Sequence, residues 1–475
     1  MKEFNLSEIR SAMQRPNFIF IQAEDTGCAQ RCYGNRLAHT PHIDRLAAEG
    51  CRYSRAYATA PVCAPSRSST VMGQTAFSQG SHHMRSLLAH PPRLYTHHLR
   101  DAGYYVNWAN KTDFNFEPPE DFADDRHDWT DDLAAGRLPA DRPFFLYTNL
   151  FVTHESTMWP GEYDRLVRPH LEPGQHCDPQ AVPVPAYLPD TPVVRADIAR
   201  HYDALAVQDQ QVGRILEALE RSGHAANTVV VYMGDHGRGL YREKRWCYDA
   251  GLRIPLILRA PGWVTPGSCS AEPVSVLDMA PTLLRLADIA IPERYHGRVL
   301  CGPEPHPAPE FVFAGRDRMD EQFDRVRAAS SERYHYIRND FPELPYASRI
   351  EYLEEQGTTR EGRRLHAEGR LSPAGQLFFA ETKPAEELYD TLADPNCVHN
   401  LADDPAHSNT LSRHRQALSG FLDRTGDLGR VPEARLIEEG RVSDILDDYR
   451  RRIQPLPKGQ QIGPQPAPIE MPARP

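Results

Sequence analysis

Three apolar segments of the chain are each followed by side chains that can bind a cation or move a proton. These side chains are Glu24, Asp25, His154, Asp235 and His236. In a parallel sheet the carboxyl ends of the strands meet at one edge, and ligands bind beyond that edge. If the three segments are neighbouring strands, these side chains gather in one place. The pattern therefore predicts a catalytic site assembled from distant parts of the sequence.

The segments that must position these side chains have the composition of buried strands. Four short apolar runs fit this description, residues 17–23, 142–151, 228–233 and 253–259. Residues 197–220 carry apolar side chains at helical spacing, and residues 41–50 begin with proline and end with glycine, as short helices do. Strands that alternate with helices predict an α/β fold whose mostly parallel sheet is covered on both faces.

The composition narrows the class of protein. Of the 475 residues, 25% are charged and 40% are hydrophobic, which is ordinary for a globular protein. A formal net charge of −11 argues against a nucleic-acid partner. The sequence has neither a signal-peptide core nor an apolar run of membrane-spanning length, which predicts a cytoplasmic location without membrane contact. Nine scattered cysteines do not indicate a disulfide framework.

A change of composition near residue 300 predicts two domains and a tail. Residues 16–300 form the expected catalytic domain. After a proline-rich linker, residues 311–450 form a smaller α+β domain with short strands expected at residues 311–314, 334–338 and 387–389. Residues 453–475 are rich in proline and polar residues, which indicates an extended tail.

A short motif carries the most specific chemical signal in the chain. Cys63, Pro65, Ser66 and Arg67 form the pattern Cys-x-Pro-Ser-Arg, which is the signature of type I sulfatases. The chain resembles this family in further segments that follow in the expected order, at residues 16–27, 33–47, 234–256 and 387–401. Three more segments resemble the branch related to heparan N-sulfatase, at residues 110–115, 153–156 and 315–320.

The resemblance implies a fold and a reaction. The fold is α/β of the alkaline phosphatase and sulfatase type, with a large, mostly parallel sheet flanked by helices and a smaller C-terminal α+β domain. The reaction is hydrolysis of a sulfate ester or sulfamate, with a sulfated carbohydrate as the expected substrate and inorganic sulfate as a product. The family converts the motif cysteine to formylglycine, so the resemblance implies that modification at Cys63 and a formylglycine-generating enzyme as a partner.

The resemblance also implies a metal site. Its ligands are Glu24, Asp25, Asp235 and His236, together with the modified Cys63. Oxygen ligands favour Ca²⁺ or Mg²⁺, and the nitrogen of His236 leaves Mn²⁺ open, so we expect a divalent cation with Ca²⁺ as the first choice. Position 24 is glutamate where the family more often has aspartate, which puts the coordination there in question.

Catalytic roles follow from the same resemblance. Arg67 holds the hydrated formylglycine, and Asp235 accepts a proton from the attacking hydroxyl. Lys111, His154 and Lys244 bind the sulfate, and either His154 or Lys244 protonates the leaving group. A hydrated aldehyde suits this chemistry because one hydroxyl can attack sulfur and the other can later expel sulfate, whereas a thiol is a poor nucleophile for a sulfate ester.

Five further residues are candidates for contact with the substrate. They are His82, His83, Asp113, Arg316 and Arg318. Asp113 stands where many sulfatases have a histidine that helps to decompose the covalent intermediate, so His82, His83 or Asp113 itself is left to do this. Arg316 and Arg318 follow the linker and either reach back to an anionic substrate or belong to a charged surface.

Two other functions stay open from the sequence. A hydrolase of phosphonate monoesters or phosphodiesters uses the same scaffold with formylglycine and a similar metal site. A non-catalytic protein that binds sulfated glycans would keep Cys63 unmodified, and the near-complete set of predicted ligands argues against it. The sequence does not define the oligomeric state, and a homo-oligomer is compatible with it.

Overall fold

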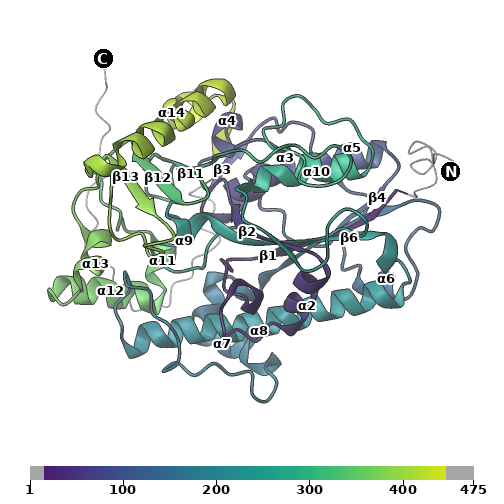
Figure 1. The fold of residues 1–475 in the computed structure, drawn as a ribbon, viewed down its shortest axis with the longest axis horizontal. Coiled ribbons are helices and arrows are strands. Elements are labelled where there is room, and N and C mark those ends of the chain that lie inside the picture. Colours follow the sequence, from purple (N-terminus) through teal and green to yellow (C-terminus); the bar gives the residue numbers. More distant parts are fainter. Residues whose placement is uncertain (1–14, 446–475) are drawn as a thin grey trace.

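The computed structural model describes residues 15–445, and its centre is an eight-stranded sheet (Figure 1). The strands lie in the order β4-β5-β1-β6-β7-β2-β8, and β9 also pairs with β2. Their bounds are Tyr105–Trp108 for β4, Phe144–Leu150 for β5, Asn17–Ala23 for β1, Thr228–Gly234 for β6, Arg253–Arg259 for β7, Cys51–Tyr57 for β2, Ser268–Ser270 for β8 and Val274–Ser275 for β9.

The part of this sheet that carries the predicted site is parallel. β1 pairs in parallel with both β5 and β6, so Ile19 lies opposite Leu146 on one side and Val230 on the other. β4 extends the parallel part beyond β5, whereas β7 runs antiparallel to β6 and β2. The prediction of a mostly parallel sheet is confirmed.

Side chains along β1 alternate between two buried faces of the sheet. Ile19 and Ile21 pack against one set of helices, and Phe18 and Phe20 belong to the core on the opposite side (Figure 1). The first set is α8 (Pro192–Arg221), α2 (Pro41–Glu49) and α6 (Thr130–Ala134), and the second is α3 (Cys63–Met72), α5 (Tyr95–Asp101) and α10 (Met279–Leu286). Cover on both faces explains why β1 is an almost continuous apolar run.

The long helix α8 begins earlier than the sequence pattern indicates. Its first residue is Pro192 rather than residue 197. Thr191 accepts a hydrogen bond from the Val194 backbone NH, and proline suits the first helical position because it has no NH to satisfy. Val212 and Ile215 lie on the face of α8 that packs on the sheet.

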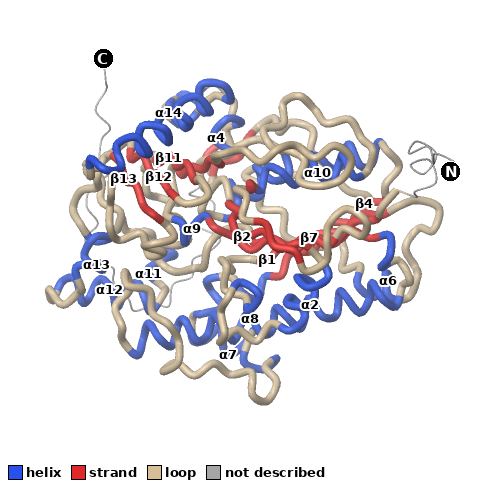
Figure 2. Tube along the Cα trace, viewed as in Figure 1, coloured by secondary structure: helices blue, strands red, loops and turns tan. Residues whose placement is uncertain are grey.

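A second, smaller sheet lies beyond residue 311 (Figure 2). Its strands run antiparallel in the order β10 (Val312–Arg316), β11 (Val326–Ser330), β12 (Tyr334–Asn339) and β13 (Glu386–Asp390). Helix α14 (Ser408–Thr425) packs on this sheet through Leu418 and Phe421. β11 has no counterpart among the predicted strands, because its sequence, VRAAS, has one large apolar side chain and little alternation.

The described residues also include further helices, most of them short, and a third sheet of two strands. The helices are α4 (Ala76–Gln79), α7 (Pro160–Leu166), α9 (Asp249–Leu252), α11 (Glu351–Glu354), α12 (Gly357–Ala367), α13 (Pro373–Gln376) and α15 (Glu433–Glu438). β14 (Val442–Asp444) pairs antiparallel with β3 (Ser86–Leu88). The last described strand therefore lies beside a strand from the first part of the chain. The domain boundaries stay a prediction, and the predicted tail at residues 453–475 lies outside the described residues.

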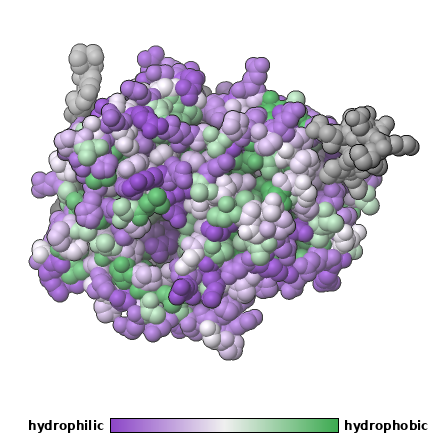
Figure 3. Space-filling model, in the orientation of Figure 1, coloured by the Kyte–Doolittle hydropathy of each residue, from purple (hydrophilic) through white to green (hydrophobic). Residues whose placement is uncertain are grey.

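The surface of the described part is mixed in polarity. Figure 3 shows hydrophilic and hydrophobic residues interspersed over the face drawn in Figure 1. Within residues 15–445, no helix has the length and apolar character needed to cross a membrane. Some large apolar side chains are exposed, and one of them, Phe151, lies beside the site described next.

Candidate active site

The carboxyl ends of β1, β5 and β6 lie side by side, and predicted site residues follow each of them. Glu24 and Asp25 directly follow β1, and Asp235 and His236 directly follow β6. A single 3-10 turn, η3 (Phe151–Thr153), follows β5 and precedes His154. The structure thus brings together residues from three distant parts of the chain.

Cys63 is the first residue of α3 and lies within this group. Its Sγ is 3.5 Å from Glu24 Oε1, 3.9 Å from Asp25 Oδ1 and 3.2 Å from His236 Nε2. The residue is 3% exposed, and burial raises the pKa of its thiol well above the ordinary value. An unmodified Cys63 is therefore a neutral thiol at neutral pH and a weak nucleophile.

Four residues of the group offer a compact set of ligand atoms. One atom from each lies within 4.8 Å of the others, and all four side chains are buried. The four residues are Asp25, Cys63, Asp235 and His236. Adjacent buried carboxylates repel one another unless positive charge lies between them, and oxygen ligands with one imidazole nitrogen suit a hard divalent cation. The residues present therefore fit a divalent metal ion.

The backbone of Asp25 adopts an unfavourable conformation. Its φ is 45°, in the left-handed region, which costs a non-glycine residue roughly 1–3 kcal/mol. Its NH donates to Asp235 Oδ1 at 2.9 Å, and its Oδ2 accepts from the Glu155 NH at 2.8 Å. These contacts offset the strain and fix the positions of both aspartates.

Arg67 lies one helical turn after the amino end of α3 and links two carboxylates. Its guanidinium donates to Glu24 Oε2 at 2.9 Å and to Asp235 Oδ2 at 3.0 Å. It also donates to the Tyr147 hydroxyl at 2.7 Å and to Asn149 Oδ1 at 2.5 Å. The rigid fork of arginine can hold several oxygens at once, so Arg67 sets the two carboxylates relative to each other.

Glu24 is surrounded by positive charge. Lys111 donates to its Oε1, and Asn149 Nδ2 donates to its Oε2 at 2.6 Å. Burial alone would raise the pKa of Glu24, but the charges of Lys111 and Arg67 outweigh burial and hold this pKa well below its usual range. Asn149 is absent from the predicted site residues, although a polar side chain near the end of an apolar strand is a signal for it.

Lys244 lies between two carboxylates. Its Nζ is 2.7 Å from Asp25 Oδ2 and 2.8 Å from Glu155 Oε1. Burial alone would lower the pKa of Lys244, but the charge of Asp25 above all outweighs burial and raises this pKa well above its usual value. Arg245 donates to both oxygens of Glu155 at 2.8 Å. Glu155 and Arg245 were not predicted, because such pairings depend on packing between distant segments.

His154 is a partly exposed member of the group, as Lys111 is. Its Nδ1 lies 2.8 Å from Ser156 Oγ, and one of its nitrogens lies within 4.8 Å of Cys63 Sγ. Burial, followed by the charge of Lys244, lowers the pKa of His154 to about 4. The imidazole is therefore neutral at pH 7 and faces the position of Cys63.

Asp113 lies at the outer side of the group. Its Oδ2 is 3.3 Å from Lys111 Nζ, and about a quarter of its side chain is exposed. Burial alone would raise the pKa of Asp113, but the charges of Lys111 and Arg85 outweigh burial and lower it. Arg85 also donates to Asp320 Oδ1 at 3.0 Å, which links this outer side of the group to the loop after β10. A role for Asp113 in the reaction stays a prediction.

The other predicted substrate residues are buried. The ring centroids of His82 and His83 are 4.2 Å apart, and His83 Nδ1 accepts from the Arg318 backbone NH at 3.2 Å. The Arg318 guanidinium donates to both oxygens of Glu433, at 2.7 and 2.6 Å. The guanidinium of Arg316 lies 5.7 Å from the centroid of an indole ring. These contacts join segments of the fold, and contact with substrate stays a prediction for all four.

Known proteins share this arrangement of elements. A family model described as Sulfatase matches residues 16–289, which is more than half of the chain. An ulvan-active sulfatase from Formosa agariphila is 33% identical over 466 residues, which cover 90% of this chain and 78% of that protein. The chain belongs to the sulfatase family. The N-sulphoglucosamine sulphohydrolase of Homo sapiens is 26% identical to this sulfatase, with coverage of 87% of this chain and 88% of that protein.

A structural relative supports the fold of this sulfatase. The solved structure of a 2-O GAG sulfatase matches with a TM-score of 0.64 and 20% identity, covering 88% of this chain and 94% of that chain. The predicted fold class and the predicted family are both confirmed. Membership of the family makes the protein a sulfuric ester hydrolase. Sulfatases generally use a metal ion and formylglycine, and the ligand atoms around Cys63 are compatible with both.

Proposed function

We propose that this sulfatase cleaves a sulfate ester or sulfamate on a sugar, with a formylglycine made from Cys63 and a divalent cation. The observation that carries the proposal is the position of Cys63, whose Sγ lies within 4 Å of Glu24, Asp25 and His236. Positive side chains stand around the same position, which suits stabilisation of an anion during attack.

The proposed chemistry at position 63 divides among neighbouring side chains. Formylglycine supplies, when hydrated, one hydroxyl that attacks sulfur and a second that releases sulfate. Asp235 can accept the proton of the attacking hydroxyl, because its carboxylate belongs to the same compact set of atoms as Cys63. Lys111 and Lys244 are placed to bind sulfate oxygens, and the amino end of α3 favours negative charge there.

The cation that we propose is Ca²⁺, with Mg²⁺ and Mn²⁺ as alternatives. Its ligands would be Glu24, Asp25, Asp235 and His236, together with the side chain at position 63. The cation supplies polarisation of the sulfate oxygens. Carboxylate oxygens dominate the set, and Ca²⁺ accepts an irregular oxygen-rich geometry more readily than Mg²⁺ does.

Removal of the cation with a chelator is expected to lower both activity and thermal stability. A ligand that binds only the folded chain stabilises it by about 2.7 kcal/mol at 100 times its Kd, which for this length corresponds to about 3 °C in Tm. Differential scanning calorimetry of the chelated protein with each cation added back measures the shift. Asp235→Asn should lose the shift, and a wild-type Tm that does not respond to any of the three cations contradicts the site.

A sulfated sugar is the substrate class that we propose. One relative is named for activity on ulvan and another for sulfate on the nitrogen of glucosamine. We infer a carbohydrate leaving group here as well. One open side of the site lies at His154, which is partly exposed and lies close to Cys63. The departing oxygen or nitrogen needs a proton, and Lys244 is charged at pH 7 whereas the His154 imidazole is neutral.

The reaction class is tested with two substrates that share a leaving group. We expect the matured protein to hydrolyse an aryl sulfate with a kcat/KM at least about tenfold above that for the corresponding aryl phosphonate monoester. Because the leaving group is the same, its reactivity cancels in the ratio. Dominant turnover of the phosphonate would replace the proposal with a phosphonate monoester hydrolase on the same scaffold.

A formylglycine-generating enzyme is the partner that we propose for maturation. Because Cys63 is 3% exposed in the folded chain, that enzyme would act before α3 is packed. Assembly as a homo-oligomer and a cytoplasmic location stay predictions from the sequence.

A further inference from the structure

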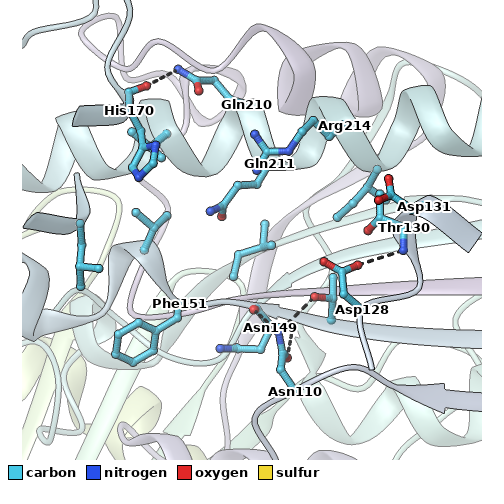
Figure 4. Close-up of a pocket in the computed structure, with 16 residues that line it drawn as sticks. Asn110, Asp128, Thr130, Asp131, Asn149, Phe151, His170, Gln210, Gln211 and Arg214 are labelled. Carbon is cyan, nitrogen blue, oxygen red and sulfur yellow. Dashed lines mark hydrogen bonds between the residues drawn. The ribbon is translucent and has the colours of Figure 1, made fainter. Parts of the chain in front are cut away.

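A cavity of about 550 Å³ lies beside the candidate active site, between α8 and the carboxyl end of β5 (Figure 4). This volume falls in the range of about 300–1,000 Å³ that small-molecule sites occupy. The cavity shares Asn149 with the group around Cys63, since Asn149 lines the cavity and also bonds Arg67. The proposed cleavage reaction gives the rest of the cavity no role.

Helix α8 contributes three polar side chains to the cavity lining, Gln210, Gln211 and Arg214. Gln211 extends from α8 into the open space in Figure 4, and its Oε1 is buried without a hydrogen-bond partner among residues 15–445. Arg214 lies one helical turn further and forms no ion pair within the described part of the chain. A buried polar atom without a partner costs roughly 1–3 kcal/mol. A ligand hydroxyl would give the Gln211 amide the contact that the protein does not provide.

An exposed aromatic ring lies where the cavity approaches the active site. Phe151 lines the cavity and is 44% exposed. Its ring stacks on that of His154, with centroids 4.7 Å apart and planes 17° apart. His154 in turn has a nitrogen within 4.8 Å of Cys63 Sγ. A ligand chain that leaves the cavity across Phe151 therefore reaches the position of the proposed nucleophile.

The charges of the lining indicate what kind of ligand fits. Asp128 and Asp131 line one end of the cavity, and together they outweigh the single positive charge of Arg214. This balance opposes a second sulfate group in the cavity. Carboxylates and amides instead bond hydroxyl groups, and the ring of Phe151 offers an apolar surface to the face of a sugar ring.

We propose that this cavity is a subsite for an uncharged sugar residue, adjacent in the carbohydrate chain to the sulfated residue at Cys63. The inference rests on the proposed function, since it requires a carbohydrate substrate longer than one residue. In this arrangement Phe151 stacks on the neighbouring sugar and Gln211 bonds its hydroxyls.

The test compares a substrate that reaches the cavity with one that does not. The probes are a sulfated tetrasaccharide whose unsulfated residues are neutral and 4-nitrophenyl sulfate, both used with the matured, full-length protein. Gln211→Leu keeps the side-chain volume but removes the hydrogen bonds. The ratio of kcat/KM for the tetrasaccharide to that for the aryl sulfate is expected to fall about 5- to 10-fold. Gln416→Leu, the same change at an exposed position of α14, should leave the ratio unchanged.

The remaining outcomes separate the subsite from the proposed function. The subsite is overturned if the ratio of the two kcat/KM values in Gln211→Leu equals that of the wild type, whether both values fall together or neither changes. A second measurement does not depend on turnover: the desulfated tetrasaccharide is titrated into the wild-type protein and Gln211→Leu, and binding is followed by saturation-transfer NMR. Binding that weakens in the variant supports the subsite, and no binding at millimolar concentration overturns it. A protein that cleaves aryl sulfate but no sulfated carbohydrate refutes the proposed substrate class instead.

Discussion

Replacing Cys63 with alanine is expected to abolish sulfate hydrolysis and to leave the fold intact. The side chain at this position lies among Glu24, Asp25 and His236, and alanine offers neither a nucleophile nor its precursor. We expect kcat/KM for an aryl sulfate to fall by about 10⁴-fold or more, as for loss of other enzyme nucleophiles. The change in the free energy of unfolding should stay within about 1–2 kcal/mol, because only one sulfur atom is lost.

Cys301→Ala is the matched control for this substitution. Cys301 is also buried, at 5% exposure, but it belongs to the apolar core on the α3 side of the sheet. The activity of the Cys301→Ala protein should therefore stay close to that of the wild type. The mass of the peptide that contains Cys63 should show conversion of the thiol to an aldehyde. A Cys63→Ala protein that keeps wild-type turnover refutes the mechanism.

Replacing Arg67 with alanine is expected to cost both stability and activity. Arg67 neutralises Glu24 and Asp235 in a region where all three side chains are almost fully buried. Removing one partner of a buried ion pair leaves an uncompensated charge and typically costs about 3–5 kcal/mol. We expect the free energy of unfolding, measured by chemical denaturation of the metal-free protein, to fall by this amount. Activity should also be lost, because the two carboxylates are no longer held in position.

Two further variants distinguish this effect from a general loss of charge. Arg364→Ala removes an exposed arginine that bonds Glu361 and Glu368, and such surface pairs contribute at most about 1 kcal/mol. Arg67→Lys keeps the charge but not the fork, so its stability should lie between those of Arg67→Ala and the wild type. If Arg67→Ala is no less stable than Arg364→Ala, Arg67 does not have the structural role described above.

Local composition predicts the centre of the large sheet but not its margins. The predicted runs at residues 17–23 and 253–259 coincide with β1 and β7, because strands buried on both faces are apolar along their whole length. β2 has the sequence CRYSRAY, whose charged and polar residues do not form an apolar run, so the same pattern does not predict it. It is a strand because β7, β8 and β9 pair with it, and pairing of this kind overrides local propensity.

The candidate site divides in a similar way. A motif identifies Cys63 and Arg67, and positions after apolar runs indicate the acidic and histidine residues. The roles of Glu155 and Arg245 could not be predicted from the sequence. Their mutual contact is created by the packing of η4 (Glu155–Met158) against the loop after β6. The cavity beside Phe151 likewise exists only once α8 lies along the end of β5.

The pairing of β3 with β14 has a consequence for the order of folding. Residues 86–88 are synthesised long before their partners at residues 442–444, because most of the described chain lies between them. Arg85, which immediately precedes β3 and donates to Asp320, therefore belongs to a part of the structure that is complete only after β14 has been synthesised. Contacts between such remote segments form slowly, since a long loop must close first. The nascent chain thus contains α3, which carries Cys63, well before β14 is available to pair with β3.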